Sequence, residues 1–139
     1  MHNTRRLTTG LVVGCFGAIA GAALGFAVLR VAWPAYAAAE TDKAYDFAML
    51  VSRLSLGALC TTAGACVATT ISGGHPRAAW WLGGVFVVAS LPSHLYYSWL
   101  DYPLWYHVVY LGYLLPIAVV TGRVVRAQQS RAWCSTFAV

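Results

Sequence analysis

Charged residues are scarce in this chain of 139 residues: they make up 9% of it, whereas 60% of the residues are apolar. A typical soluble domain has about 25% charged residues. A chain with so few charges cannot surround its apolar residues with a solvated surface, which excludes an ordinary soluble domain. The scarcity of charge therefore indicates a protein that lies in a lipid bilayer.

Acidic residues are few, and none of them interrupts a hydrophobic segment. All four lie between such segments or at their edges: Glu40, Asp42, Asp46 and Asp101. Small multidrug antiporters depend on a carboxylate within the first helix, and this chain lacks that group. It also shows neither a nucleophile paired with a base nor a cluster of metal ligands. We therefore expect a non-enzymatic protein without a cofactor.

The four cysteines show no pattern of a disulfide or metal site. Cys15, Cys60 and Cys66 lie in hydrophobic segments, and Cys134 follows the last one. The spacing between Cys60 and Cys66 matches neither a redox pair nor a zinc motif. Quinone-linked disulfide enzymes need outward-facing cysteine pairs, so that class is excluded as well, and small packing residues are the simplest interpretation.

The apolar residues gather into four long segments, at approximately residues 10–33, 47–71, 78–100 and 104–122. Each is close to the ~20 residues that an α-helix needs to cross a bilayer. We predict an all-α integral membrane bundle of four transmembrane helices, forming one domain over residues 1–139, with a tail at 123–139. The very short connection at residues 101–103 makes the last two helices an antiparallel hairpin.

Six basic residues flank these segments and fall on one side of the predicted membrane: Arg5, Arg6, Arg77, Arg123, Arg126 and Arg131. All the acidic residues and Lys43 fall on the other side. Because cytoplasmic loops are rich in Lys and Arg, we predict that both termini are cytoplasmic, in a bacterial inner (plasma) membrane. The net charge of +5 thus orients the protein, and no nucleic acid partner is expected.

The first segment has a second interpretation as a cleaved secretory signal. Arg5 and Arg6 precede the apolar run, and residues 35–37 read Ala-Tyr-Ala, the pattern of a signal peptidase site. Its run of about 23 residues exceeds a normal signal core, and Arg30 interrupts its end. These features favour a retained helix, and the cleaved alternative stays open.

Glycines in the first helix predict close helix packing. Gly17, Gly21 and Gly25 follow one another at a spacing of four, and Gly64 lies in the second segment among other small residues. In lipid, helices associate largely through such close backbone contacts. We expect the first two helices to pack together, and a homodimer face is the alternative. Pro92 and Pro116 should bend the third and fourth helices.

Two arginines are placed where a charge is costly. Arg53 lies about two turns inside the second helix. Helical side chains lean toward the N-terminus, so Arg53 can reach toward Asp46 or Asp101. Arg30 leans toward the membrane centre and needs a partner such as a carbonyl group or an acidic loop residue.

Aromatic residues are dense in the predicted outer half, where belts of Trp and Tyr usually lie. The alternative to a belt is an amphipathic pocket near the outer leaflet, with Arg53 as its positive pole. The candidate ligand-binding residues are Arg53, Tyr97, Tyr110 and Trp105. His94 and His107 lie at similar depth and are candidates for a metal or haem site, although histidines bonded to tyrosines or water are the simpler interpretation.

The last helix carries a recurring pattern: Pro103, Trp105 and Tyr106 at its start, then Leu115, Pro116, and finally Gly122 and Arg123. This pattern resembles a loosely defined group of small bacterial four-helix membrane proteins with a P-x-W-aromatic start to the last helix. The glycine-rich first helix is similar too. The resemblance implies this architecture and no catalytic residues.

The function expected from these features is a structural or accessory membrane protein. It would lie in the lipid bilayer and pack as a homo-oligomer or against a larger membrane protein. The alternative is a transporter or binding protein for a small or lipidic molecule, acting through the outer aromatic pocket.

Overall fold

The computed structural model describes the backbone of residues 2–136 and the side chains of residues 4–131. Its elements are α1 (His2–Ala32), α2 (Pro34–Asp42), α3 (Phe47–Ile71), α4 (Ala78–Pro92), the π-helix η1 (Ser93–Tyr97) and α5 (Leu104–Thr136). Over this range the chain is all helical, without strands. Four segments are long and apolar enough to cross a membrane: Thr4–Ala32, Phe47–Ile71, Ala78–Tyr97 and Leu104–Arg131. The prediction of an all-α chain with four helices long and apolar enough to span a membrane is therefore confirmed.

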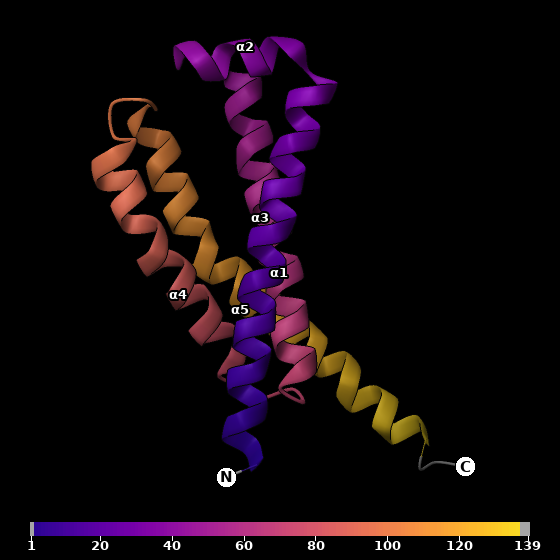
Figure 1. Ribbon diagram of the computed structural model, residues 1–139. Helices are drawn as coiled ribbons and strands as arrows, with labels where there is room; N and C mark the ends of the chain where they lie inside the picture. The colour runs from indigo at the N-terminus through magenta and orange to yellow at the C-terminus, as the bar shows by residue number, and fades with distance from the viewer. Residues whose placement is uncertain (1, 137–139) are drawn as a thin grey trace.

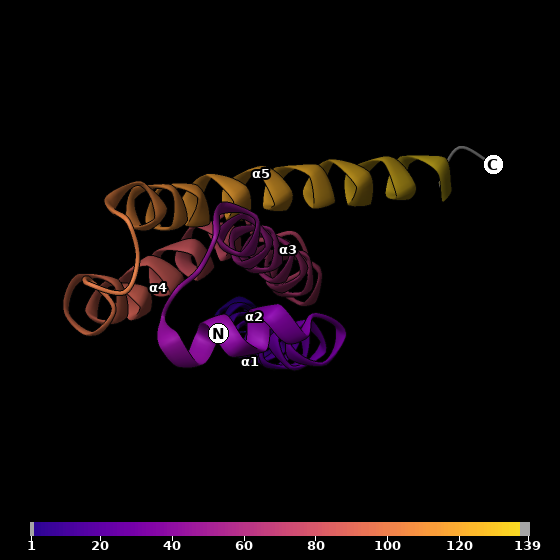
Figure 2. The same cartoon turned by 90° about the horizontal axis from the view of Figure 1, so that it is seen from above.

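The long helices form two antiparallel pairs, α1 with α3 and α4 with α5 (Figure 1). Both ends of the described chain lie at one end of the molecule, which we call the terminal end. The short helix α2 and the connection at residues 98–103 lie at the opposite end, which we call the α2 end. Figure 2 shows α3 between α1 and α5, with α2 lying across α1.

Several helix boundaries differ from the prediction. The first helix starts at His2 and the last continues to Thr136, so most of the predicted tail belongs to α5. Polar residues such as Gln128 and Arg131 are good helix formers, so leaving the apolar segment does not end the helix. The third predicted helix, 78–100, is α-helical only to Pro92 and then continues as η1 to Tyr97.

The α2 helix was not predicted. It begins directly after Trp33 because Pro34 occupies its first turn, where a missing N–H costs nothing. It ends at Lys43, which adopts the left-handed conformation (φ 57°) and donates its backbone N–H to the carbonyl of Ala39. Tyr36 and Ala39 are buried on its inner side, so α2 folds back over the molecule as part of its core.

Glycines of α1 meet α3 along a line that differs from the predicted one. A Cβ added at Gly14 would lie 2.7 Å from the carbonyl oxygen of Gly64, and one at Gly64 would lie 2.8 Å from that of Gly14. A Cβ at Gly25 would collide with Leu56, and one at Gly21 would lie 3.6 Å from the sulfur of Cys60. Backbone contact between α1 and α3 therefore leaves no space for a side chain at several points.

Gly17 is the exception among the four glycines predicted to pack helices, because a Cβ there would meet no atom within 4 Å. The reason is helical periodicity: at 3.6 residues per turn, a stripe of constant spacing four drifts around the helix. The face toward α3 contains Gly10, Gly14 and the buried Ala18. Gly17 lies beside this line, on an exposed part of α1.

The two prolines act differently. At Pro92 the α-helix gives way to η1, and the N–H of Ser98 donates to the carbonyl of Ser93 at 2.8 Å, the wider loop of a π-helix. Pro116 lies within α5 without ending it. Between α4 and α5, a Cβ at Gly83 would lie 2.9 Å from the side chain of Leu115, so this hairpin is also closely packed.

Candidate functional site

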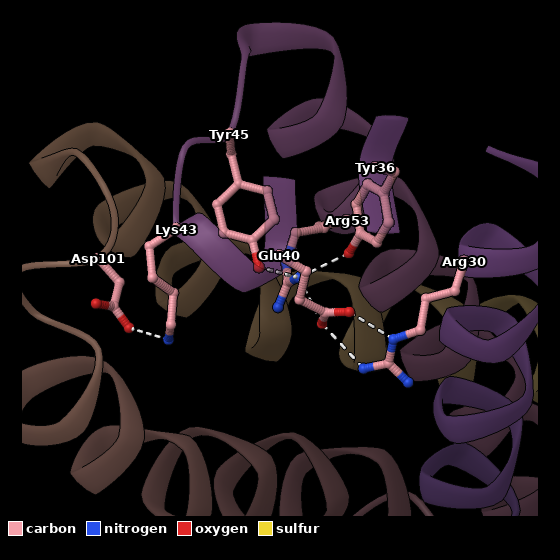
Figure 3. Close-up of polar contacts among 7 residues, drawn as sticks. All are labelled: Arg30, Tyr36, Glu40, Lys43, Tyr45, Arg53 and Asp101. Carbon is pink, nitrogen blue, oxygen red and sulfur yellow. Dashed lines mark hydrogen bonds and ion pairs between the residues drawn. The ribbon is translucent and has the colours of Figure 1, made fainter. Parts of the chain in front are cut away.

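The centre of the α2 end is a chain of charged groups that joins three helices (Figure 3). Arg30 of α1 donates from Nε and Nη2 to the two carboxylate oxygens of Glu40 in α2, at 2.5 and 2.9 Å. The same carboxylate lies 3.7 Å from Nη1 of Arg53 in α3. Arg53 also donates to the hydroxyl groups of Tyr36 at 2.6 Å and Tyr45 at 3.3 Å. One carboxylate thus lies between two guanidinium groups and offsets one of their two positive charges.

Aromatic rings surround the guanidinium group of Arg53. Its Cζ lies 4.9 Å from the ring centre of Phe26, 5.0 Å from that of Tyr45 and 5.3 Å from that of Tyr102. These distances are within the range of cation–π attraction, which strengthens when the cation is removed from water. Only 16% of the Arg53 side chain is exposed. The charge is therefore held inside the molecule by one carboxylate, hydroxyl groups and ring faces.

The partners of Arg53 differ from those predicted. The side chain reaches toward the α2 end as expected, but neither Asp46 nor Asp101 receives it. Asp46 accepts the backbone N–H of Met49 at 2.8 Å and caps α3, whereas Asp101 pairs with Lys43 at 2.6 Å. Because α2 folds back over α3, it places Glu40 closer to Arg53 than either residue. The partners predicted for Arg30 are a carbonyl group or an acidic loop residue. The structure pairs it with the carboxylate of Glu40, which lies in α2 and not in a loop.

Ionisation outside the long helices follows these contacts. Hydrogen bonding and charge attraction from Arg30 hold the pKa of Glu40 below its ordinary value. The bond to Asp101 raises the pKa of Lys43. Burial raises the pKa of Tyr36 and of Tyr102. Each hydroxyl therefore stays protonated, and the Tyr36 oxygen faces Arg53 as a neutral acceptor.

His94 and His107 form a second polar site, on the hairpin of α4 and α5. Their Nδ1 atoms lie 2.9 Å apart, a direct imidazole–imidazole hydrogen bond. His107 is 2% exposed, and its buried Nε2 has no partner among the described residues. The His94 ring stacks on Tyr110, with centroids 4.3 Å apart, and the His107 ring stacks on Trp99 at 5.3 Å. The two rings are nearly perpendicular, at 83°, and meet through their Nδ1 atoms, which the sequence alone could not establish.

A metal or haem between these two rings does not fit this geometry. A zinc ion would lie about 2.0–2.1 Å from each nitrogen, which requires the two nitrogens to be further apart than in a direct hydrogen bond. Within the described side chains, no group of three His, Cys, Asp or Glu residues could hold a metal ion. Cys15, Cys60 and Cys66 are free thiols, and Cys134 lies outside the described side chains.

The predicted ligand-binding residues do not form one site. Tyr97 is 77% exposed and contacts the ring of Tyr96. Trp105 lies beside Phe47, with ring centroids 5.6 Å apart, and Tyr110 belongs to the His94 cluster. None of the three is among the contacts of Arg53. The sequence analysis missed Glu40, Tyr36 and Tyr45 as its partners, and the only signal was Pro34, which starts the helix that carries two of them.

A cavity of about 310 Å³ lies between the two helix pairs. Its walls come from α1, α3, α4, η1 and α5 and are mostly apolar, with His94 and Tyr110 among the lining residues. Other residues that line the cavity include Ile19, Phe86, Ala89, Ser90, Ser93 and Leu114. Arg53 is not among the residues that line it. The cavity is thus separate from the charged cluster.

Comparison with known proteins adds no family assignment: family models, curated proteins and solved structures were all searched, and none matches this chain.

Proposed function

We propose that the chain is a small, non-enzymatic integral membrane protein that acts as a structural or accessory subunit, packing with itself or with a larger membrane partner. In this proposal it crosses a bacterial inner membrane four times, with both termini in the cytoplasm, as the distribution of basic residues indicates. The polar groups of the α2 end support a structural role, because the chain itself supplies the partners of Arg30, Arg53 and Lys43.

The observation that carries the proposal is a second line of residues on α1 that the chain leaves uncovered. Only 11% of the most apolar stretch of α1 is buried within the molecule, whereas 28% of the corresponding stretch of α3 is buried. The exposed residues Val13, Gly17, Ala20, Leu24, Ala27 and Val31 follow one another at alternating spacings of four and three. This is the spacing at which two helices pack side by side over several turns. Small residues within the line would let a partner helix come close.

Gly17 offers a clean test because a larger side chain there disturbs nothing within the chain. We would release the protein gently from its own membrane and record native mass spectra of the wild type and of Gly17→Leu. Gly112→Leu on α5 is the matched control, since a Cβ at that glycine also meets nothing within 4 Å. We expect a second copy or a second polypeptide at fixed stoichiometry in the wild type and in Gly112→Leu, and its loss in Gly17→Leu.

Two outcomes contradict the proposal. A bare wild-type protomer, without a second chain under any gentle release condition, would remove the accessory role. A complex that survives Gly17→Leu unchanged would show that this face of α1 is not the contact. If the second chain is another copy of the protein, the assembly is a homo-oligomer; if it is a different polypeptide, its identity indicates the process served.

A further inference from the structure

The cavity between the helix pairs has one polar corner, and the hydrogen bond between the two histidines decides the chemistry of that corner. In a neutral pair, one Nδ1 carries the proton and donates it, and the other accepts it. If His94 donates, His107 accepts at Nδ1, so the single proton of the neutral His107 ring is on its buried Nε2. That arrangement leaves a buried N–H without an acceptor. If His107 donates, its Nε2 is instead a bare lone pair.

The arrangement in which His107 donates costs less free energy, because buried N–H groups without an acceptor are rarer in proteins than acceptors that lack a donor. His107 therefore donates from Nδ1 to His94. The proton of the neutral His94 ring is then on Nε2, for which no hydrogen-bond partner exists among the described residues. Since His94 is one of the residues that line the cavity, its Nε2–H is the hydrogen-bond donor that this ring can offer to an occupant.

The remaining walls favour an uncharged, partly aromatic occupant. Ile19, Phe86 and Leu114 make the interior apolar, and no Arg or Lys lines it. An acidic head group would lie there without a counter-ion, which is costly in a low-dielectric site. The ring of Tyr110 stacks on His94 at the polar corner, and the hydroxyl groups of Ser90 and Ser93 lie on the same wall. A flat ring carrying carbonyl oxygens matches these groups.

Size and access agree with a membrane-dissolved molecule. The volume of about 310 Å³ is at the lower end of the range of about 300–1,000 Å³ for small-molecule pockets. It suits a ring head better than a phospholipid head group with two chains. Ile19 on α1 and Ala89 on α4 are both lining and exposed, so the cavity opens between these helices toward the surrounding lipid. An apolar chain attached to the ring can leave by this route.

We propose that this cavity binds a quinone-type molecule, with its ring head against Tyr110, one carbonyl oxygen accepting a hydrogen bond from Nε2 of His94, and its apolar chain passing between α1 and α4. The site is a binding site only, and no electron transfer is part of the proposal. It goes beyond the structural role proposed above, and neither proposal depends on the other.

The test measures retention of a short-chain benzoquinone with one isoprenoid unit by the full chain in lipid nanodiscs, against empty nanodiscs of the same lipid. We expect saturable binding to the wild type. His94→Phe keeps a flat ring beside Tyr110 but removes the donor, and should weaken binding about tenfold, the size of one lost hydrogen bond. An analogue of equal length whose carbonyls are replaced by methyl groups should lose affinity for the wild type to a similar extent.

Two neighbouring positions on α4 supply a control that does not depend on the histidines. Ala89→Phe places a ring in the cavity and should abolish binding, whereas Val88→Phe lies outside the lining residues, on a side chain that is 67% exposed, and should leave it unchanged. Unchanged helix content by circular dichroism shows that each variant is folded. The proposal is overturned if the wild type retains no more quinone than empty nanodiscs do, or if the methyl analogue binds the wild type as tightly as the quinone does. It is also overturned if Ala89→Phe binds the quinone as well as Val88→Phe does, or if a long-chain fatty acid displaces bound quinone at a lower concentration than added quinone does.

Discussion

The terminal half and the α2 half of this molecule hold their helices together by opposite means. In the terminal half, backbones touch where side chains are missing, as between Gly14 and Gly64. In the α2 half, large rings fill the space between helices: Tyr113 reaches from α5 to donate to the carbonyl of Leu54 at 3.0 Å. Charged groups also join α1, α2 and α3 in this half of the molecule (Figure 3).

The difference shows two solutions to association in lipid, where apolar burial supplies little driving force. Contact without side chains maximises dispersion attraction but tolerates no added atom. A network of charges and tyrosines tolerates small changes of shape, but each missing partner leaves a polar group exposed to a low-dielectric surrounding. Substitutions should therefore act through steric collision at one end and through lost partners at the other.

The largest expected effect is at the glycine contact. Gly14→Leu places a side chain against the carbonyl of Gly64 and the side chain of Ala68, so α1 and α3 must separate. We expect a destabilisation of about 3 kcal/mol or more, the upper range for overpacking, measured by denaturant titration in detergent with circular dichroism. Gly112→Leu on α5, where a Cβ would meet no atom within 4 Å, is the control and should change stability by less than about 0.5 kcal/mol. Equal effects at both glycines would contradict the contact described here.

A smaller loss is expected when the charge network loses its carboxylate. Glu40→Gln leaves Arg53 inside its cage of rings without a neutralising partner and should cost about 2 kcal/mol in the same titration. Asp42→Asn on the same helix is the matched control, since Asp42 is an exposed carboxylate at the end of α2. If both substitutions lower the free energy of unfolding by the same amount, the carboxylate of Glu40 contributes no more to stability than a surface charge does.

The same carboxylate should give the protein an acid-sensitive step. The pKa of Glu40 is depressed in the folded state, so its contribution to stability is present above the ordinary carboxyl pKa and is lost as the pH falls through the depressed value. The melting temperature should therefore fall as the pH drops below the ordinary carboxyl pKa, by more in the wild type than in Glu40→Gln. Parallel pH curves for the two proteins would exclude Glu40 as a source of this dependence.

The smallest effect should come from the ion pair of Lys43 with Asp101, because the Lys43 side chain is 54% exposed. Exposed pairs contribute about 0–1 kcal/mol and are screened by salt. Asp101→Asn should lower stability only slightly at low salt and by nothing measurable at high salt. A loss that persists in high salt would indicate that Asp101 makes a contact in addition to this pair.

The four spans could be predicted from the sequence, whereas the contacts between them could not. Length and apolar composition alone define a spanning segment. In a soluble helix the polar face shows which side is buried, but a membrane helix is apolar all round, so its rotation cannot be read from periodicity. This is why Gly17, which lies on an exposed part of α1, was grouped with the glycines that meet α3, and why Tyr97, Trp105 and Tyr110 were grouped around Arg53.

Helix α2 was missed for a different physical reason. Residues 34–42 carry Pro, Glu and Asp after a long apolar run, which reads as a loop, yet Pro at the first turn and a run of alanines favour a helix. Once α2 was missed, Glu40 could not be placed near Arg53, and the nearer acidic residues in the sequence, Asp46 and Asp101, took its place in the prediction. The position of one short helix thus determines the partners of the most deeply placed charge.

In the proposed topology the chain crosses a membrane four times, with the α2 end outside the cell and the terminal end in the cytoplasm. Single cysteines at the exposed positions Thr41, in α2, and Gly73, in the turn between α3 and α4, would test it in a variant without the natural cysteines. Intact cells are treated with a membrane-impermeant maleimide. The account predicts labelling of the Thr41 position before permeabilisation and of the Gly73 position only after it. Labelling of both positions in intact cells, or of neither, would contradict the account.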